Sequence, residues 1–396
     1  MRNKTVCVVT GTRADYGLIK PLLKRIIETQ ELCLRLVVTG MHLCSEFGYT
    51  VNEIKNDGIP IDEQLETLMA SDNMTGMTKS TAVTMLSFAD YFDRKHPDIL
   101  LILGDRFEIF ACATAAAFAN IPIAHLYGGD TTQGAVDEFL RHSITKMSYL
   151  HFPSTEQSRN RIIQLGEDPD RVYNVGALSV ENIQKIKLYD KNDIRKKLNF
   201  AFSDCFGLVT FHPVTLDTES CAEKETLELL QALDKFPEMS FILTKANADA
   251  NGRIVNEVLS KYANERNNCI LVESLGLQLY LSAMKSAAVV IGNSSSGIYE
   301  APGLGTPTVN IGNRQNGRVQ SESIINCNAI ENDIINAIIK ALSKEWVKKT
   351  QNSANPYGDG TTSDKIVKIL QQTLNTEKIN VMKKFYDLPF IEDIGK

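Results

Sequence analysis

The chain lacks the cysteine patterns of a secreted or zinc-binding protein. Its eight cysteines include no Cys-x-x-Cys pair, and no group of histidines and cysteines has the spacing of zinc ligands. Several lie inside apolar runs, as Cys7 does in TVCVVTG and Cys112 in FACATAAAF. We therefore expect small buried thiols in a reducing compartment, without a disulfide framework.

Long apolar runs and an excess of positive charge are missing as well. No apolar run approaches the roughly 20 residues that span a bilayer. The opening MRNKTVCVVTGT is typical of a strand and a turn, not of a signal peptide. The formal net charge of −6 argues against a nucleic-acid-binding surface, which is basic. These features predict a cytoplasmic protein that binds neither nucleic acid nor membrane, although a local anion site stays possible.

What the chain does contain is a regular alternation of short β-branched runs and longer helical segments. At 396 residues it is too long for one ordinary hydrophobic core, so we expect two domains. The predicted strands are 5–11, 33–40, 98–105, 121–129, 150–154, 172–176, 206–213, 239–247, 269–274, 288–294 and 306–312. Helical segments separate nearly every pair, which indicates parallel sheets covered on both faces. The predicted fold class is α/β, with two doubly wound, Rossmann-like domains that meet near the polar helical segment 178–205.

Nearly all candidate polar residues fall where predicted strands end. They are Arg13, Asp15, His42, Asp105, Arg106, Glu108, His125, Asp130, Asp137, Glu138, Arg141, His142, His212, Asn247, Asp249, Ser294, Ser295, Ser296, Glu300 and Arg314. Because open α/β sheets bind ligands at the carboxyl ends of their strands, this clustering predicts a ligand site. The default place for it is the cleft between the two domains.

The segment GTRADYG places Arg13 where a strand turns into a helix. It lacks the GxGxxG spacing of a dinucleotide fingerprint. A fixed positive charge beside unpaired helix N–H groups favours a phosphate. A structural ion pair between Arg13 and Asp15 explains the same residues equally well.

Carboxylates gather in LILGDRFEIF and in GGDTTQGAVDEFLRHSITK. Asp105 follows a wholly apolar strand, which favours an active-site role, whereas Glu108 in the next helix's first turn is typical of a helix cap. Glu138 and His142 are four residues apart and share one helix face, although a surface pair has the same spacing.

The second half contributes a histidine and a serine-rich loop. VTFHPVT ends a buried strand in His212, and Pro213 cannot extend the ladder, so the histidine is held at the strand's end. In GNSSSGIYE a loop of small residues begins a helix and is a suitable phosphate cradle, while ordinary N-capping explains the serines too. Glu300, one turn into that helix, is placed to accept two ribose hydroxyls.

Together these motifs resemble those of the hydrolysing UDP-N-acetylglucosamine 2-epimerases of bacterial sialic-acid and legionaminic-acid biosynthesis. The resemblance rests on GTRADYG, TGMHL, LGDRFE, DEFLRHSITK, FHPVT and IGNSSSGIYEAPGLGTPTVNIGNRQNGR, and it extends from the first strand to about residue 320. It implies a GT-B fold with domains at 1–178 and 179–374, and a C-terminal part from about 375 to 396 that crosses back to the first domain. It also implies a UDP-sugar substrate, no cofactor and a homodimer or homotetramer.

The resemblance also implies roles for individual residues. Arg13, His212, Ser294, Ser295 and Arg314 match phosphate-binding positions, Glu300 matches the ribose-binding acid, and Asn247 and Leu275 match nucleotide contacts. Asp105, Arg106, Glu138 and His42 match positions near the sugar. Tyr127 stands where non-hydrolysing and animal relatives carry a glutamate, so Asp130 and Glu138 are the remaining carboxylates of that segment.

The chemistry of the sugar indicates how such residues would work. The C–H beside an acetamido group is scarcely acidic in the intact sugar, so the departure of UDP should come first. Arg13, Arg314 and His212 would stabilise charge on the β-phosphate, each by roughly 3 kcal/mol. We expect anti-elimination to a 2-acetamidoglycal and then hydration, with Asp105 and Glu138 as acid and base and with Asp130 or His42 assisting.

Two substrates and two other classes of protein stay open on the sequence alone. UDP-N-acetylglucosamine would give N-acetylmannosamine, and UDP-N,N′-diacetylbacillosamine would give 2,4-diacetamido-2,4,6-trideoxymannose, whose methyl group the ring of Tyr127 would suit. A GT-B glycosyltransferase would use the same nucleotide site but would leave the second carbon unchanged. A UDP-sugar sensor would bind its ligand without turnover. The density of carboxylates in residues 105–142 argues against a sensor.

Overall fold

A computed structural model describes residues 3–69, 74–131, 136–213, 219–246, 252–273, 275–375 and 379–389. The chain divides into two compact units. The first unit contains Met1–Asn182 and Tyr357–Lys396, and the second contains Ile183–Pro356. Each is described by itself below.

Both units are built on a six-stranded parallel sheet with the same strand order. In the first unit the order is β3-β2-β1-β4-β5-β6, and in the second it is β12-β11-β10-β7-β8-β9. The strands are β1 (Lys4–Thr10), β2 (Leu32–Thr39), β3 (Ile61–Leu65), β4 (Ile99–Leu103), β5 (Ile123–Leu126), β6 (Leu150–Phe152), β7 (Phe206–Thr210), β8 (Ser240–Thr244), β9 (Cys269–Val272), β10 (Val289–Gly292), β11 (Thr308–Ile311) and β12 (Ile324–Cys327). When the strands are numbered from 1 within each unit, the first sheet read from β3 and the second sheet read from β9 both have the order 3-2-1-4-5-6. This is the doubly wound Rossmann order.

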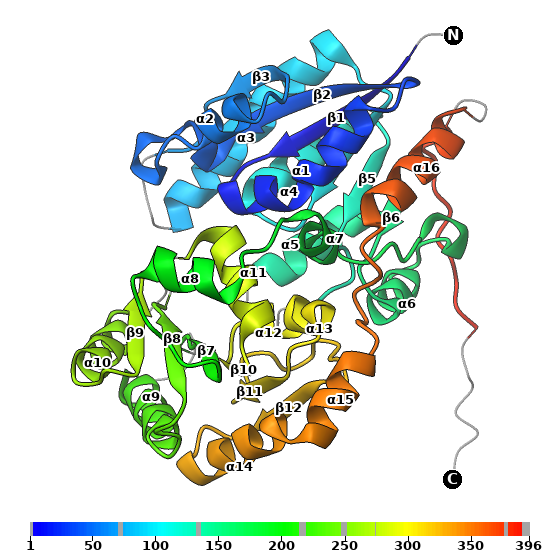
Figure 1. Ribbon diagram of the computed structural model, residues 1–396. Helices are drawn as coiled ribbons and strands as arrows, with labels where there is room; N and C mark the ends of the chain where they lie inside the picture. Colours follow the sequence, from blue (N-terminus) through cyan, green and yellow to red (C-terminus); the bar gives the residue numbers. More distant parts are fainter. Residues whose placement is uncertain are drawn as a thin grey trace. The chain divides into compact units, whose positions relative to one another are not determined.

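Helices connect the strands and cover both faces of each sheet (Figure 1). The first unit has α1 (Arg13–Ile27), α2 (Val51–Asn56), α3 (Met74–Lys95), α4 (Phe107–Phe118), α5 (Val136–Met147), α6 (Glu156–Gln164) and α16 (Thr362–Asn375), and α7 (Leu178–Lys185) crosses the division. The second has α8 (Lys191–Leu198), α9 (Glu219–Leu233), α10 (Gly252–Asn264), α11 (Gly276–Ser286), α12 (Ser296–Tyr299), α13 (Ala301–Leu304), α14 (Glu331–Leu342) and α15 (Lys344–Asn352). Short 3-10 helices are η1 (Gly40–Leu43), η2 (Ser45–Phe47) and η3 (Pro169–Arg171).

The apolar strands feed two cores in each unit because successive side chains point to opposite faces of a sheet. In β1, Val6 and Val8 join the core that α1 and α16 cover, whereas Cys7 and Val9 join the core under α3 and α4. The second unit repeats this arrangement, with one core under α9, α10 and α14 and another under α11 and α13. Burial on both faces explains why these strands are continuous apolar runs.

The last helix, α16, belongs to the first unit. Its apolar side chains Ile366 and Leu370 pack in one core with Leu22 and Ile26 of α1. The chain re-enters this unit at Tyr357, whose carbonyl accepts a 2.6 Å hydrogen bond from Ala177 N. The return therefore begins earlier than the expected residue of about 375, and the first segment ends at 182 instead of 178.

Most of the predicted strands are present, with three differences. The edge strands β3 and β12 are additional to the prediction. The predicted strand 172–176 is reduced to a single parallel bridge, between His151 and Val172, although Tyr173 N and Val175 N still donate to the carbonyls of His151 and Pro153.

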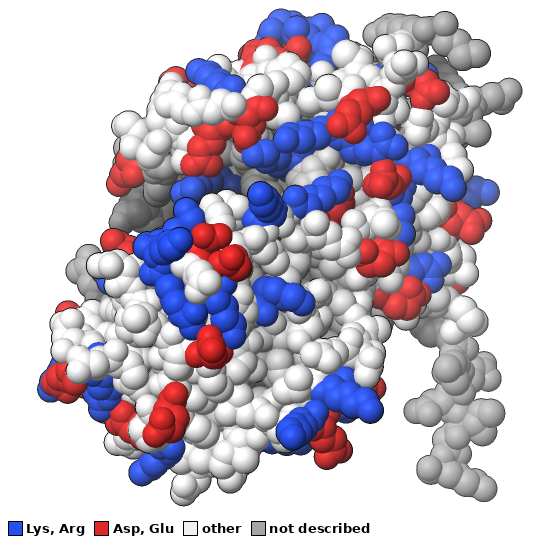
Figure 2. Space-filling model, viewed as in Figure 1, with Lys and Arg blue, Asp and Glu red and all other residues white. Residues whose placement is uncertain are grey.

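The face of the protein drawn in Figure 2 carries charged side chains of both signs. Figure 2 shows acidic and basic side chains interspersed on the visible face, with basic ones grouped over α8, which carries Lys191, Arg195, Lys196 and Lys197. Over the described ranges, no helix is both long enough and apolar enough to cross a membrane.

Candidate functional site

Arg141 organises the carboxylates at the carboxyl edge of the first sheet. It lies in α5, and its side chain is only 6% exposed. Its Nε donates to Oδ2 of Asp105 at 2.8 Å, and Nη2 donates to the same oxygen. Its Nη1 donates to Oε2 of Glu138 at 3.0 Å and to the backbone carbonyl of Asp130 at 2.8 Å. One buried guanidinium thus holds Asp105 and Glu138 together, as charge-assisted pairs do.

The other oxygen of Glu138 faces a histidine. Oε1 lies 3.2 Å from Nε2 of His142, one helical turn further along α5. Asp130 is held separately, since its Oδ1 accepts a 2.5 Å hydrogen bond from Ser158 Oγ of α6. The structure therefore brings the predicted residues Asp105, Asp130 and Glu138 to one edge and gives each a defined orientation.

A second charged pair follows β4. Nε of Arg106 donates to Oε1 of Glu108 at 2.7 Å, and Glu108 is 1% exposed. Gly11 makes room for this carboxylate, because a Cβ at that position would lie 2.6 Å from the same Oε1. Glu108 is thus a buried partner of Arg106, a more specific role than the expected helix cap.

Arg13 and Asp15 do not pair with each other. Arg13, the first residue of α1, is 70% exposed and places its Nε 3.0 Å from Oε1 of Glu53. Asp15 donates its backbone N–H to Oγ1 of the N-cap residue Thr12. Its buried Oδ2 has no hydrogen-bond partner in the described part of the chain. Burial raises the pKa of Asp15 to about 6, although Thr12 and Arg106 act in the opposite direction.

His42 lies inside the first unit, fully buried in η1. Its Nε2 is 3.1 Å from Thr10 Oγ1, and its Nδ1 is 2.7 Å from Thr50 Oγ1. Burial lowers the pKa of His42 to about 4, so the ring is neutral at physiological pH. This placement favours a role in joining β1 to the 40–50 segment over the expected part in proton transfer.

Tyr127 packs inward. Its hydroxyl accepts a 2.8 Å hydrogen bond from Leu178 N, and its ring packs against the core beside α1 and α16. Its backbone has φ +64, a conformation that a non-glycine residue adopts rarely. The argument that this ring accommodates a methyl group of the substrate therefore loses its structural basis.

In the second unit, Asn293 ties three predicted loops together at the end of β10. Its Oδ1 accepts from His212 N, and its Nδ2 donates to His212 O, both at 2.7 Å. Its backbone carbonyl accepts from Arg314 Nη1 at 3.2 Å and from Gln315 Nε2 at 2.8 Å. The segments FHP, GNSSSG and GNRQNGR thus meet around one asparagine that is 1% exposed.

The serine loop is organised by a chain of hydroxyl groups. Thr210 Oγ1 lies 3.2 Å from Tyr280 Oη, which lies 2.6 Å from Ser296 Oγ. Ser296 Oγ in turn donates to Ser294 Oγ at 2.9 Å. Ser295 occupies the N-cap position of α12, but its side chain makes no capping hydrogen bond with the described residues. N-capping therefore does not account for Ser295.

Glu300 stands between α12 and α13 with a perturbed carboxyl group. Burial raises the pKa of Glu300 to about 7, against the attraction of Arg318. Arg318 itself donates to Gln315 Oε1 at 2.8 Å. Near neutral pH this carboxyl group is therefore present in both its ionised and its protonated form. Only the ionised form has both oxygens free to accept hydrogen bonds from hydroxyl groups.

The structure says less about two other predicted nucleotide contacts, Asn247 and Leu275. Asn247, like Asp249, lies outside the described residues. Leu275 is the N-cap residue of α11, and its side chain packs against the core of the second unit.

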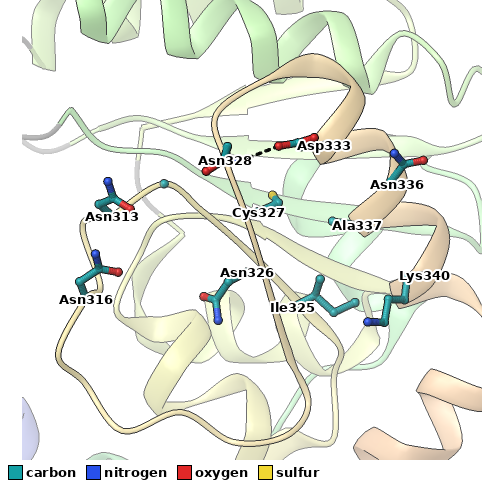
Figure 3. Close-up of a pocket in the computed structure, with 11 residues that line it drawn as sticks. Asn313, Asn316, Ile325, Asn326, Cys327, Asn328, Asp333, Asn336, Ala337 and Lys340 are labelled. Atoms are coloured by element: carbon teal, nitrogen blue, oxygen red, sulfur yellow. Dashed lines mark hydrogen bonds between the residues drawn. The ribbon is translucent and has the colours of Figure 1, made fainter.

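A polar groove of about 440 Å³ lies at the ends of β11 and β12, beside α14 (Figure 3). Two of its asparagines make hydrogen bonds within the fold: Asn326 bonds to Asn310 and Gln320, and Asn328 donates to Asp333 at 2.8 Å. Arg314, Ser294 and Ser295 are not among the described residues that line it, although Asn313, the neighbour of Arg314, is. Over the described ranges, no group of three or more histidine, cysteine, aspartate or glutamate residues could hold a metal ion.

Three residues at these sheet edges are more important to the arrangement of the site than the sequence indicated. Arg141 was noted only among the polar residues near strand ends, Asp15 also as a possible partner of Arg13, and Asn293 only as part of a motif. The spacing Glu138–Arg141–His142 on one helix was the available signal for Arg141. Nothing in the sequence indicates that Asn293 bonds across to His212.

Comparison with known proteins gives consistent matches. The family model described as UDP-N-acetylglucosamine 2-epimerase matches residues 24–371. The GDP/UDP-N,N′-diacetylbacillosamine 2-epimerase (hydrolyzing) of Campylobacter jejuni is 40% identical, over 98% of this chain and 100% of that protein. The polysialic acid biosynthesis protein P7 of Escherichia coli is 37% identical, over 98% of each.

A solved structure supports the fold. The UDP-N-acetylglucosamine 2-epimerase of Neisseria meningitidis, bound to UDP-N-acetylglucosamine, aligns with a TM-score of 0.74 and 21% identity, over 93% of this chain and 100% of that one. At that identity the likeness speaks for the fold alone. It agrees with the two parallel sheets and confirms the expected α/β class of the GT-B type.

Proposed function

Because this chain belongs to the UDP-N-acetylglucosamine 2-epimerase family, we propose that it is a hydrolysing epimerase of a UDP-linked 2-acetamido sugar. The reaction releases UDP and a free sugar with inverted configuration at its second carbon. The observation that carries this proposal is Arg141 holding Asp105 and Glu138 side by side at the edge of the first sheet. Two carboxyl groups held in fixed positions can serve as the base and the acid in proton transfer at a sugar carbon.

The leaving group is the task of the second unit. As UDP departs, the bond from the anomeric carbon to the β-phosphate oxygen breaks and its electron pair moves to that oxygen. Arg314 and His212, joined through Asn293, are suited to bind the diphosphate, with Ser294 and Ser295 beside them. Arg13 is a further phosphate ligand, provided it leaves Glu53. Glu300 binds the ribose, and Leu275 and Asn247 complete the nucleotide contacts.

Proton transfer is the task of the first unit. Loss of UDP leaves an oxocarbenium-like sugar whose neighbouring C–H is strongly acidified, so an ordinary carboxylate suffices as base. Asp105 or Glu138 takes this proton, which gives a 2-acetamidoglycal. The other carboxyl group, protonated from the solvent, then delivers a proton to the opposite face of the second carbon. Water adds at the anomeric carbon, and the proton that this water loses returns to the same carboxylate. Arg106 and Asp130 orient the sugar, and His42 acts by holding the segment after β2 in place.

For the substrate we favour UDP-N,N′-diacetylbacillosamine, with 2,4-diacetamido-2,4,6-trideoxymannose, a precursor of legionaminic acid, as product. Support comes from the 40% identical relative whose name states this sugar. UDP-N-acetylglucosamine is the second candidate, since the family model that matches residues 24–371 is described by that sugar nucleotide. We place the reaction in the cytoplasm, consistent with free cysteines throughout the described residues, and expect a homodimer or homotetramer.

The test uses each sugar nucleotide separately in deuterated water. We expect release of UDP and a free sugar that carries deuterium at its second carbon, with the higher kcat/KM on the diacetylbacillosamine nucleotide. An unlabelled product would contradict the elimination route. A higher kcat/KM on UDP-N-acetylglucosamine would reverse the choice of substrate, and release of UDP only in the presence of an acceptor would identify a glycosyltransferase.

A further inference from the structure

The segment after α16 lies against the end of α5. Lys383 donates hydrogen bonds from its ammonium group to three acceptors, each at 2.7 Å: the carbonyls of Lys146 and Ser148 and Oε2 of Glu167. Lys146 stands in the last turn of α5, where helix carbonyls have no partner within the helix. Lys383 therefore caps the C-terminal end of α5 from a part of the chain more than 230 residues away.

Glu167 makes this contact a network. The carboxylate is 3% exposed and also bonds to Lys146 Nζ at 2.6 Å and to His151 Nε2 at 3.0 Å. Burial acts to raise the pKa of Glu167, but its three basic neighbours together lower this pKa to about 2, so the carboxylate stays charged at physiological pH. A buried carboxylate with three donors fixes their relative positions.

Two further contacts hold the same segment in register. Tyr386 N donates to Gly166 O at 3.0 Å. The ring of Phe385 lies 4.9 Å below Lys146 Nζ, and it covers Gly166 so closely that a Cβ there would be 2.4 Å from the ring. Lys383, Phe385 and Tyr386 thus form a clamp on α5 and on the loop after α6.

The clamped helix is the one that presents Glu138 and Arg141. Arg141 is five residues, or about 7.5 Å, from Lys146 along α5. A small shift or rotation at the C-terminal end of a rigid helix displaces the side chains further along it. Displacements near 1 Å of reacting groups cost up to about 10²-fold in rate.

We propose that Lys383 is a positioning residue for this reaction, and that residues 383–386 set the orientation of the helix that carries Glu138 and Arg141. The inference rests on the proposed function, because it assigns those residues to proton transfer. Lys383 touches no reacting atom in this scheme. It acts through α5, and the second unit, which binds UDP, does not depend on it.

The experiment compares Lys383→Met with Lys384→Met, an exposed neighbour whose substitution serves as the matched control. We expect Lys383→Met to lower kcat about tenfold, with KM and the dissociation constant of UDP within twofold of the parent. Lys383→Arg, which keeps several donors, should recover most of kcat. Hydrogen exchange of the amides of residues 144–149 should accelerate in Lys383→Met and not in Lys384→Met.

Two results would overturn the proposal. One is equal kcat in Lys383→Met and Lys384→Met. The other is a parallel loss of kcat and UDP affinity, which would indicate a general loss of folding. If the parent protein releases no UDP, the proposed function fails, and the hydrogen-exchange comparison still decides whether the clamp holds α5.

Discussion

The two units share one strand order and differ in what stands at the carboxyl ends of their strands. The first presents ions paired with ions, namely Arg141 with Asp105 and Glu138, and Arg106 with Glu108. The second presents amides and hydroxyls, joined through Asn293 and through the chain from Thr210 to Ser294. The same topology therefore positions two kinds of chemistry, and the residue types at the edge decide which.

The difference also separates two demands of the proposed reaction. Proton transfer needs charged groups whose geometry is fixed, which buried ion pairs supply at a cost in desolvation. Binding a nucleotide diphosphate needs many donors of moderate strength, which hydroxyls, amides and a few arginines supply. We therefore expect substitutions in the first unit, apart from those at the proposed phosphate ligand Arg13, to act on kcat and those in the second to act on nucleotide affinity.

The largest effect should follow the change Arg141→Met. It leaves Asp105 and Glu138 without their shared cation, so we expect kcat to fall about 10³-fold and the free energy of unfolding to drop by about 3 kcal/mol. The dissociation constant of UDP, measured by calorimetry, should stay within twofold. Arg94→Met, which removes an exposed pair with Glu63, is the control and should leave kcat unchanged. Equal loss of kcat and UDP affinity in Arg141→Met would contradict the assignment of proton transfer to the first unit and of UDP binding to the second.

An intermediate effect should appear in the pH dependence of UDP binding. The pKa of Glu300 is raised to about 7, so its ionised fraction falls as the pH drops from 8 to 6. A carboxylate accepts two ribose hydroxyls only when ionised, and we expect affinity to fall about tenfold over that range. Glu300→Gln serves as control for the titration of UDP itself. The prediction fails if its pH profile matches that of the parent.

The same raised pKa has a consequence for stability with a defined sign. The folded-state pKa of Glu300 lies above the unfolded value of 4.5, so ionisation opposes folding. The penalty is absent below about pH 4.5, grows as the pH rises toward 7, and is constant above that.

The smallest effects should distinguish neighbouring serines. Ser296→Ala removes hydrogen bonds to Tyr280 and Ser294, so we expect it to lower the free energy of unfolding by about 1 kcal/mol. Ser295 makes no capping bond within the described chain, and Ser295→Ala should cost less than about 0.5 kcal/mol. Urea denaturation measures both. A larger cost for Ser295→Ala would mean that its hydroxyl supports the loop after all, and would weaken its assignment to ligand binding.

The sequence predicted the central strands well because they are buried on both faces. β1 and β4 are continuous apolar runs that alternate with helices, and that pattern has few other interpretations. The edge strands were harder. β3 reads IDEQL with alternating exposure, and β12 is the short run IINC, so their strand character depends on pairing with β2 and β11.

The candidate site shows the same contrast between features that the local sequence marks and features that depend on pairing with distant residues. That Asp105 and Glu138 lie near one sheet edge follows from strand ends, which the sequence marks. Which cation joins them depends on a contact between residues 36 apart, and the bond from Asn293 to His212 spans 81 positions. Such contacts are settled by how the chain packs, which local propensity does not encode.

Asn293 has a consequence for anyone who would transplant the nucleotide-binding edge onto another scaffold. Because its side chain and carbonyl join FHP, the serine loop and GNRQNGR, these segments form one indivisible module. Gly292 adds a steric condition, since a Cβ there would lie 2.0 Å from Thr210 O. A graft that moves one loop without the others would carry over the residues and lose their arrangement.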